Sequence, residues 1–409
     1  MDAQLDASDA VIPAPPEDTL HEVIEHLAAI ERAPCSPGER EAAEWLADRL
    51  REAGVDELAL EDEPSWGTFP PNATTLSALG AAGAALTLAG RRKLGGALSA
   101  LALAGFVDEI QNGPRIFRRA VREERTTVNV VARAGDPQAA RTLVVLAHHD
   151  AAQTGFMFDQ TAVAAFHDRF PEVIPNIKTQ PPQWWGALAG PVAGIAAALS
   201  GRRGPARAGV AIGAASVGVL GDMWRSRVVP GANDNLTAVG CLVALAEMLR
   251  EQPVEGVRVW LVSAGAEETL QDGIRAFMAR HRDELPVDST FFLNLDTVGS
   301  PRLVLLEGEG PVWMEHFDED FRDRVFGLAQ RHGLKLERGF RARASTDAVI
   351  PHRHGYPMAS VSSVNDYHYL THYHLPSDVP ENLHWETVVE AARLSYAVAG
   401  ELSSAGPAA

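Results

Sequence analysis

The fold is decided by residues 143–150, LVVLAHHD, an unbroken apolar run that ends in histidine and aspartate. Such a run predicts a strand whose two faces are both covered, as in a sheet with helices on each side. The run stops at His148, and Asp150 follows two residues later. In open α/β sheets, ligands bind at the carboxyl ends of the strands. This stretch therefore predicts a strand of such a sheet and the edge where chemistry takes place.

Strand-like and helical patterns alternate on both sides of this stretch. The other strand-like runs are Glu57–Leu60, Thr127–Ala132, Val257–Val262 and Thr290–Leu295, and the helical patterns include Leu236–Arg250 and Asp318–His332. This alternation predicts an α/β fold with a central mixed, mostly parallel sheet flanked by helices. We expect the domain to span residues 17–400, between a flexible acidic N-terminus at 1–16 and a tail at 401–409.

Composition limits the classes of function. The chain has 409 residues, of which 46% are hydrophobic, enough for a well-buried core. Its formal net charge of −18 excludes a nucleic-acid binder, which needs a positive surface to displace counterions from phosphates. The two cysteines, Cys35 and Cys241, indicate neither a disulfide framework nor a thiolate zinc site. Residues 1–18 have no basic or apolar region, so no cleavable secretion signal is expected.

Two further acidic clusters lie at predicted turns. The first is PGANDN at 230–235, where Asp234 precedes a helix and could also be a simple N-cap. The second follows the predicted strand Val257–Val262, where small residues lead to Glu267 and Glu268. Adjacent side chains diverge, so one of these carboxylates can hold a metal while the other faces the water bound to it.

The last two clusters complete a set of metal-binding side chains. Asp296 ends the apolar run FFLNLD at 291–296, and His374 lies in the imidazole-rich segment HYHLPSD at 372–378, whose His372 we interpret as structural. With His148, the clusters supply two imidazoles, three metal-binding carboxylates and a spare glutamate. Nitrogen and oxygen donors without thiolates suit a pair of zinc ions, with manganese or cobalt as alternatives.

The order and wording of these motifs resemble the co-catalytic zinc exopeptidases, which include bacterial secreted aminopeptidases, glutamate carboxypeptidase II and the transferrin receptor. That family's pattern runs His-x-Asp, Gly-Ala-x-Asp-Asn, Glu-Glu, an Asp after an apolar strand, and His-x-Pro-x-Asp. The chain carries HHD at 148–150, GANDN at 231–235, EE at 267–268, Asp296 and HLPSD at 374–378, in that order. Matches in series and in fitting strand contexts make the resemblance specific.

The resemblance implies a centre of two metal ions held by five side chains. By motif position, His148 and Asp296 would bind one metal, Glu268 and His374 the other, and Asp234 would bridge both. We therefore expect two zinc ions per chain.

The resemblance also implies the reaction. Asp150 would orient His148, and Glu267 would be the general base that takes a proton from the water between the metals. The expected activity is hydrolysis of amide bonds by an aminopeptidase-type exopeptidase acting on a peptide or an amino-acid amide. The alternatives are a carboxypeptidase, a dipeptidase or an acyl-amino-acid amidohydrolase on the same site, and a non-catalytic scaffold.

The chain departs from the family pattern between Asp150 and Asp234, where related enzymes have a short connection. The long segment here contains Phe156, Phe158, Phe166 and Phe170, and both of its ends lie at the predicted metals. We expect it to shape the substrate pocket. The group that stabilises the oxyanion is not assigned by any motif; Tyr373 and His354 are the candidates.

Two inserted segments do not follow the α/β alternation. Residues 73–107 and 184–220 are rich in alanine, glycine and leucine, and each predicts a hydrophobic helical hairpin with a basic tip, at Arg91–Lys93 and Arg202–Arg207. One interpretation is a buried helical subdomain or a dimer interface. We favour membrane-seated helices, because one modest domain cannot easily hide four helices without a polar face. The chain would then be membrane-associated with its catalytic domain in the cytoplasm; a soluble cytoplasmic protein is the alternative, and the oligomeric state stays open.

Overall fold

A nine-stranded mixed sheet forms the centre of the computed structural model, which describes residues 12–180 and 182–404. The strands lie in the order β1-β2-β4-β3-β5-β9-β6-β7, and β8 pairs with β6. Their bounds are β1 Glu57–Ser65, β2 Arg125–Gly135, β3 Arg141–His148, β4 Val257–Ala264, β5 Thr290–Leu295, β6 Arg302–Glu309, β7 Glu315–His316, β8 Leu336–Ala342 and β9 Met358–Val364. The predicted mixed α/β fold is confirmed.

The middle of the sheet is parallel. Strands β4, β3, β5 and β9 pair in parallel in that spatial order, whereas β2 and β6 join them antiparallel. His148 at the end of β3 pairs with Ala264 at the end of β4. The carboxyl ends of these strands therefore meet at one edge, where the sequence motifs lie.

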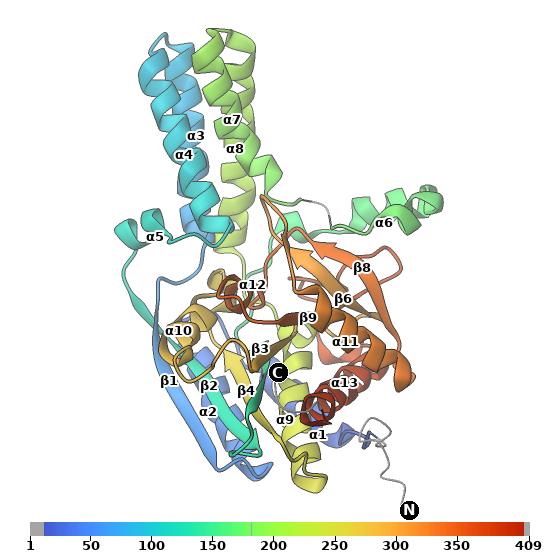
Figure 1. Ribbon diagram of the computed structural model, residues 1–409. Coiled ribbons are helices and arrows are strands. Elements are labelled where there is room, and N and C mark those ends of the chain that lie inside the picture. The colour runs from blue at the N-terminus through green and yellow to red at the C-terminus, as the bar shows by residue number, and fades with distance from the viewer. Residues whose placement is uncertain (1–11, 181, 405–409) are drawn as a thin grey trace, which may run out of the picture.

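Helices cover both faces of the sheet (Figure 1). Leu143 and Val145 pack in the core beneath α1, α2, α9, α11 and α13, while Val144 and Leu146 pack in the core beneath α10 and α12. This alternation explains why the run at 143–147 is apolar throughout. The helices are α1 Glu17–Ala28, α2 Pro37–Glu52, α5 Ile116–Val121, α6 Thr161–Arg169, α9 Thr237–Glu251, α10 Asp272–His281, α11 Glu319–Arg331, α12 Val349–Arg353 and α13 Trp385–Ser404.

Four more helices form a bundle that projects from the sheet domain (Figure 1). They are α3 Pro70–Leu88, α4 Arg92–Ile110, α7 Trp185–Ser200 and α8 Arg203–Arg225. Helix α3 packs against α4, α7 and α8, and α4 packs against α7. Small residues allow close approach: a Cβ atom added at Gly83 would lie 2.5 Å from the Ser99 Oγ, and one added at Gly194 would lie 2.3 Å from the same atom. The four helices thus bury much of their apolar surface against one another.

The predicted membrane association is wrong. Within residues 12–180 and 182–404, no helix combines the length and the apolar character needed to cross a bilayer. The prediction that a membrane holds the catalytic domain on its cytoplasmic side is therefore withdrawn as well. The physical reason is the composition of the inserted segments, because alanine and glycine leave a helix uncharged without making it strongly apolar. Their small side chains instead allow helices to pack closely together.

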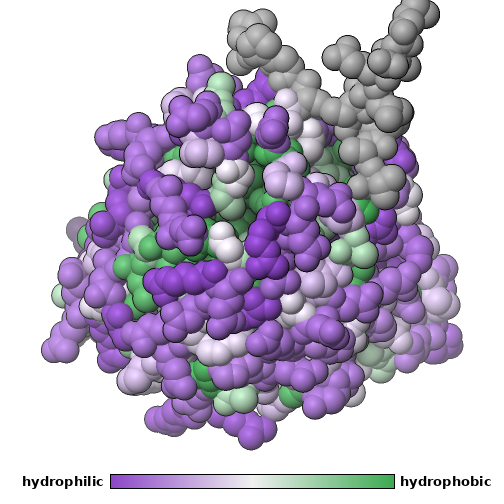
Figure 2. All heavy atoms as spheres, turned by 90° about the horizontal axis from the view of Figure 1, so that it is seen from below, coloured by the Kyte–Doolittle hydropathy of each residue, from purple (hydrophilic) through white to green (hydrophobic). Residues whose placement is uncertain are grey.

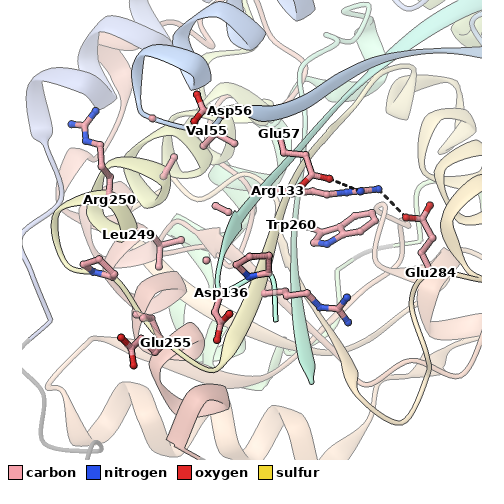
Figure 3. A pocket seen from close by; sticks show the side chains of 18 residues that line it. Val55, Asp56, Glu57, Arg133, Asp136, Leu249, Arg250, Glu255, Trp260 and Glu284 are labelled. Carbon is pink, nitrogen blue, oxygen red and sulfur yellow. Dashed lines mark hydrogen bonds and ion pairs between the residues drawn. The ribbon is translucent and has the colours of Figure 1, made fainter. Parts of the chain in front are cut away.

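The end of the molecule opposite the bundle presents mainly hydrophilic side chains, with small apolar patches between them (Figure 2). A wide cleft of about 870 Å³ lies at the amino-terminal end of β4, far along that strand from the motif residues. In Figure 3, Arg133 points across this cleft, forming ion pairs of 2.6 Å with Glu57 and 2.9 Å with Glu284 and stacking on Trp260. Arg133 is thus held by two carboxylates, and the motif residues lie at the opposite end of the strand.

Candidate metal centre

The structure brings the five predicted metal ligands together at the carboxyl edge of the sheet. His148 is the last residue of β3, and Asp296 directly follows β5. Glu268 lies in the short turn Glu267–Thr269 after β4, and Asp234 lies in the turn Ala232–Leu236 that opens α9. His374 comes from the loop between β9 and α13. Five separate segments thus contribute one side chain each.

These side chains form two groups that share one aspartate. In the first, the His148 Nε2 lies 3.3 Å from the Asp234 Oδ1 and 3.9 Å from the Asp296 Oδ2. In the second, the His374 Nε2 lies 3.2 Å from the Asp234 Oδ2 and 3.3 Å from the Glu268 Oε1. The donor atoms of each group lie within 4.8 Å of one another. This is the arrangement in which Asp234 can bridge two ions.

Unsatisfied polar atoms indicate that cations complete this site. The Asp234 Oδ2 and the His374 Nε2 are buried without a hydrogen-bond partner in the part of the chain that the structure describes. A buried polar atom without a partner is costly, and native proteins rarely keep one without an ion or a water. Imidazole and carboxylate donors in two sets of three match the preferences of zinc. The residues therefore fit the predicted metals, although their roles as ligands stay predictions.

The electrostatics of the site favour the same interpretation. Burial, together with the neighbouring Asp234, raises the pKa of Asp296 to about 6. Burial also raises the pKa of Glu267 well above its ordinary value, and Glu268 adds to the effect. Burial alone would lower the pKa of His374, but Glu268 and Asp234 raise it to about 10. Packed carboxylates repel one another, and divalent cations between them would remove that repulsion.

Asp150 has a wider role than the sequence predicts. Its Oδ1 lies 3.4 Å from the His148 Nδ1, and its main-chain oxygen lies 3.2 Å from the same nitrogen. In addition, its two carboxylate oxygens accept hydrogen bonds of 3.0 Å from the backbone N–H groups of Glu267 and Glu268. Asp150 therefore fixes the turn that carries the predicted base.

Other supporting residues are absent from the sequence-based prediction. Asp378 accepts hydrogen bonds from the backbone N–H groups of Asn233, at 2.7 Å, and Asp234, at 3.1 Å. Gln271 donates from its Nε2 to the Glu267 Oε1 at 2.6 Å and to the Ser345 carbonyl oxygen at 2.8 Å. Asp378 could have been found because it closes the HLPSD motif. Nothing in the sequence marks Gln271, since only the backbone path directs its amide toward Glu267.

A buried ion cluster connects the base of the bundle to the turn that carries Glu267 and Glu268. Arg118 pairs with Glu109 of α4 at 2.6 Å and donates to the carbonyl oxygen of Thr269 at 2.5 Å. Arg115 pairs with Asp272 at the start of α10. All four side chains are almost fully buried. The inserted helices are thereby anchored next to Glu267 and Glu268.

Three other histidines bond away from the metal groups. The His149 Nδ1 lies 3.0 Å from the Ser263 Oγ, and burial lowers its pKa to about 4. The His372 Nδ1 lies 2.8 Å from the Ser377 Oγ, and the His368 Nδ1 lies 2.6 Å from the Ile177 carbonyl oxygen. These contacts agree with a structural interpretation of His372.

A narrow cavity of about 80 Å³ reaches the metal groups, and apolar side chains form much of its wall. Phe69 comes from the start of the bundle, Phe158 and Trp184 come from the long inserted segment, and Tyr373 stacks on His374 with ring centres 3.9 Å apart. Phe156, Phe166 and Phe170, in contrast, are exposed and do not line it. Of the four phenylalanines, one therefore shapes the pocket.

A part of the chain that carries most of this site matches the model of a known protein family. Residues 215–399 match the model of peptidase family M28. The matched range contains Asp234, Glu267, Glu268, Asp296 and His374. The resemblance to the zinc exopeptidases is confirmed, and the M28 match supports a zinc-dependent metallopeptidase. A comparison with curated proteins finds no match.

Solved structures share the fold across nearly the whole chain. LapA aminopeptidase of Legionella pneumophila aligns with a TM-score of 0.55 at 11% identity, covering 95% of this chain and 72% of that one. The aminopeptidase of Aneurinibacillus sp. strain AM-1 aligns with a TM-score of 0.54 at 13% identity, covering 96% of this chain and 95% of that one. The glutaminyl cyclase of Tannerella forsythia aligns with a TM-score of 0.54 at 14% identity, covering 93% of this chain and 97% of that one. At these identities the likeness shows the fold, which the two aminopeptidases and the glutaminyl cyclase share with this chain.

Proposed function

We propose that the chain is an aminopeptidase-type exopeptidase that hydrolyses the amide bond after an N-terminal residue. The observation that carries this proposal is the pair of donor groups sharing Asp234, with Glu267 beside them. A third group, formed by His148, Glu267 and Glu268, also lies within 4.8 Å. Glu267 therefore faces the space between the two predicted metals, which is where a general base must lie.

Each residue of the site has a separate role in the proposed reaction. Asp234 would bridge two zinc ions, held on one side by His148 and Asp296 and on the other by Glu268 and His374. Bound there, the ions would lower the pKa of a water molecule and polarise the substrate carbonyl. Glu267 accepts the proton of the attacking water and passes it to the leaving amine. The Gln271 amide occupies the Glu267 Oε1, which leaves Oε2 to take the proton.

The charge of the narrow cavity supports attack from the amino-terminal end. Among the described residues that line it there is no lysine or arginine, whereas Glu267, Glu268 and Asp296 are carboxylates. A carboxypeptidase would have to seat the terminal carboxylate of its substrate there without a cation. A substrate with a free amino terminus, in contrast, needs no such cation.

A substrate panel on the metal-restored protein tests the proposal. We expect leucine 4-nitroanilide and unblocked leucyl peptides to be hydrolysed after zinc, cobalt or manganese is returned to metal-free protein, and N-acetylated versions to resist. Hydrolysis of the acetylated or longer N-acylated substrates instead would assign an acyl-amino-acid amidohydrolase. Release of carboxyl-terminal residues from blocked peptides would assign a carboxypeptidase.

Two further measurements separate the remaining alternatives. Because glutaminyl cyclases share the fold, the panel includes a peptide with N-terminal glutamine, and ammonia release without peptide cleavage would replace the proposal. Metal analysis of the purified protein addresses the non-catalytic scaffold. Two metal ions per chain together with turnover would exclude that alternative.

A further inference from the structure

A second cavity meets the first at the metal groups. It measures about 290 Å³, and it shares Phe69, Glu268 and His374 with the narrow cavity. Its other walls come from the segment before α2, from residues 151–153 after β3 and from Met223 of α8. Both cavities therefore reach the predicted metal ligands Glu268 and His374, so a substrate bound there can extend into either one.

Arg125 distinguishes this second cavity from the first. It is the first residue of β2, and its backbone is paired with Ser65 of β1. Its side chain is exposed and lies against Gly67, since a Cβ atom added at Gly67 would lie 3.6 Å from the Arg125 Cδ. Among the described residues that line the cavity, it is the sole lysine or arginine.

The surroundings of Arg125 leave its positive charge uncompensated. Within the described residues, no carboxylate forms an ion pair with it at 4.0 Å or less. Arg122 lies nearby, and its pKa is lowered first by burial and then by the charge of Arg125. Arg119 stacks on Trp66, with its guanidinium carbon 4.4 Å from the ring centre. Arg125 is therefore a cation at the second cavity with no ion-pair partner among the described residues, in a protein that carries a net charge of −18.

We propose that the second cavity is a subsite for the residue after the scissile bond, and that Arg125 binds a carboxylate carried by that residue. This inference rests on the proposed aminopeptidase function and deepens it. Arg125 offers a guanidinium to a negative group of a substrate that extends from the metal groups into the second cavity. Because the cavity is small, we assign the carboxylate to the free carboxyl terminus of a dipeptide.

Three substrates with the same leucine distinguish the source of the carboxylate. Leucyl-alanine carries it at the carboxyl terminus, leucyl-alanine amide lacks it, and leucyl-glutamate amide carries it in the side chain. We expect the zinc-loaded protein to have a KM for leucyl-alanine roughly tenfold below that for the amide. Leucyl-glutamate amide should resemble the amide; a KM as low as that of the free acid would overturn the assignment to the carboxyl terminus.

Substitution of Arg125 tests the residue itself. Arg125→Gln should raise the KM for leucyl-alanine roughly tenfold and leave that for leucyl-alanine amide unchanged. Arg91→Gln, which removes an exposed arginine at the tip of the bundle, is the matched control and should change neither. Equal KM values for acid and amide in the unaltered protein, or a preference that survives in Arg125→Gln, would overturn the proposal.

A binding measurement keeps the subsite separate from catalysis. Calorimetry with leucyl-alanine in which the peptide carbonyl is reduced to methylene, as free acid and as amide, reports affinity without turnover. Tighter binding of the acid that depends on Arg125 supports the subsite. If the protein nevertheless hydrolyses none of the three substrates, the proposed function is contradicted and the subsite is not. Equal affinity for acid and amide overturns the subsite and leaves the proposed function standing.

Discussion

Glu267 is the residue on which the proposed chemistry depends, because it lies beside both donor groups and is assigned as a ligand in neither. Glu267→Gln keeps the size of the side chain and removes the proton acceptor. We expect turnover to fall at least about a hundredfold, with two metals per chain and an unchanged melting temperature. Steady-state kinetics and metal analysis on the same sample give the answer. Near-normal turnover would assign the base elsewhere.

Gln271 orients that base, and its replacement should affect the rate rather than binding. Gln271→Met keeps the volume but removes the hydrogen bond to the Glu267 Oε1. We predict a kcat lower by roughly tenfold, with KM and metal content unchanged. Gln180→Met is the control, because Gln180 lines the same cavity and, among the hydrogen bonds of the described residues, forms none with Glu267. A similar loss of kcat in both variants would contradict the positioning role.

Glu309 makes stability depend on pH. Burial at the end of β6 raises its pKa to about 7, against the hydrogen bonds from Thr346 that lower it. A carboxyl whose folded pKa is raised stabilises the fold while it is protonated, and this contribution is lost as the pH rises through that pKa. The loss runs from the ordinary pKa of 4.5 to the folded pKa of about 7, so denaturant midpoints should fall between pH 5 and 7 in the unaltered protein and fall less in Glu309→Gln. Parallel curves for the two proteins would contradict this.

The motif residues could be predicted from sequence, and their supports could not. Metal ligands need particular side chains at strand ends, so His148, Asp234 and Asp296 stand out beside apolar runs. Gln271 acts through hydrogen bonds to Glu267 and Ser345, and their geometry depends on the backbone between distant segments. Long-range pairing of this kind leaves no local pattern in the chain.

At the scale of elements, the strands follow their sequence patterns closely and the bundle does not. The predicted strand Thr290–Leu295 has the same bounds as β5, because an apolar run between polar turns has one way to be buried. In the two inserted segments, the helical stretches on either side of the basic tips lack charged residues and a polar face, and such helices can be buried either in a bilayer or in a helical bundle. The positions of the small residues at the contacts between helices favour the bundle, but these positions become evident only when it is known which helices pack together.

Matched glycines in α8 test this packing. A Cβ atom at Gly213 would lie 2.8 Å from the Ala81 Cβ, whereas one at Gly218 meets nothing within 4 Å. Gly213→Ala should lower the free energy of unfolding by roughly 1–3 kcal/mol through overpacking. Gly218→Ala should raise it by about 0.5–1 kcal/mol, because alanine loses less backbone entropy in a helix. Thermal or denaturant unfolding measures both, and equal effects of the two substitutions would mean that α8 does not pack against α3 in this register.

For the whole molecule, the predicted metals should be part of the fold. Their removal leaves Asp234, Glu268 and Asp296 packed together with only the neighbouring histidines to offset their charge, so the folded state loses the binding energy and most of the relief of repulsion. We expect chelation to lower the melting temperature by roughly 5–10 °C and to abolish turnover, with zinc restoring both. Scanning calorimetry before and after chelation measures this. An unchanged melting temperature in protein shown to be metal-free would contradict a structural contribution of the ions.

The narrow cavity has a consequence for every other protein that shares a compartment with this one. Phe69, Phe158 and Trp184 wall off the metal groups, so only a slender, unfolded chain end can enter. Loops and folded domains are excluded by shape, whatever their sequence. On the proposed function, the inserted segments thus act as a safeguard: the hydrolase consumes unfolded fragments left by other proteases and spares folded proteins.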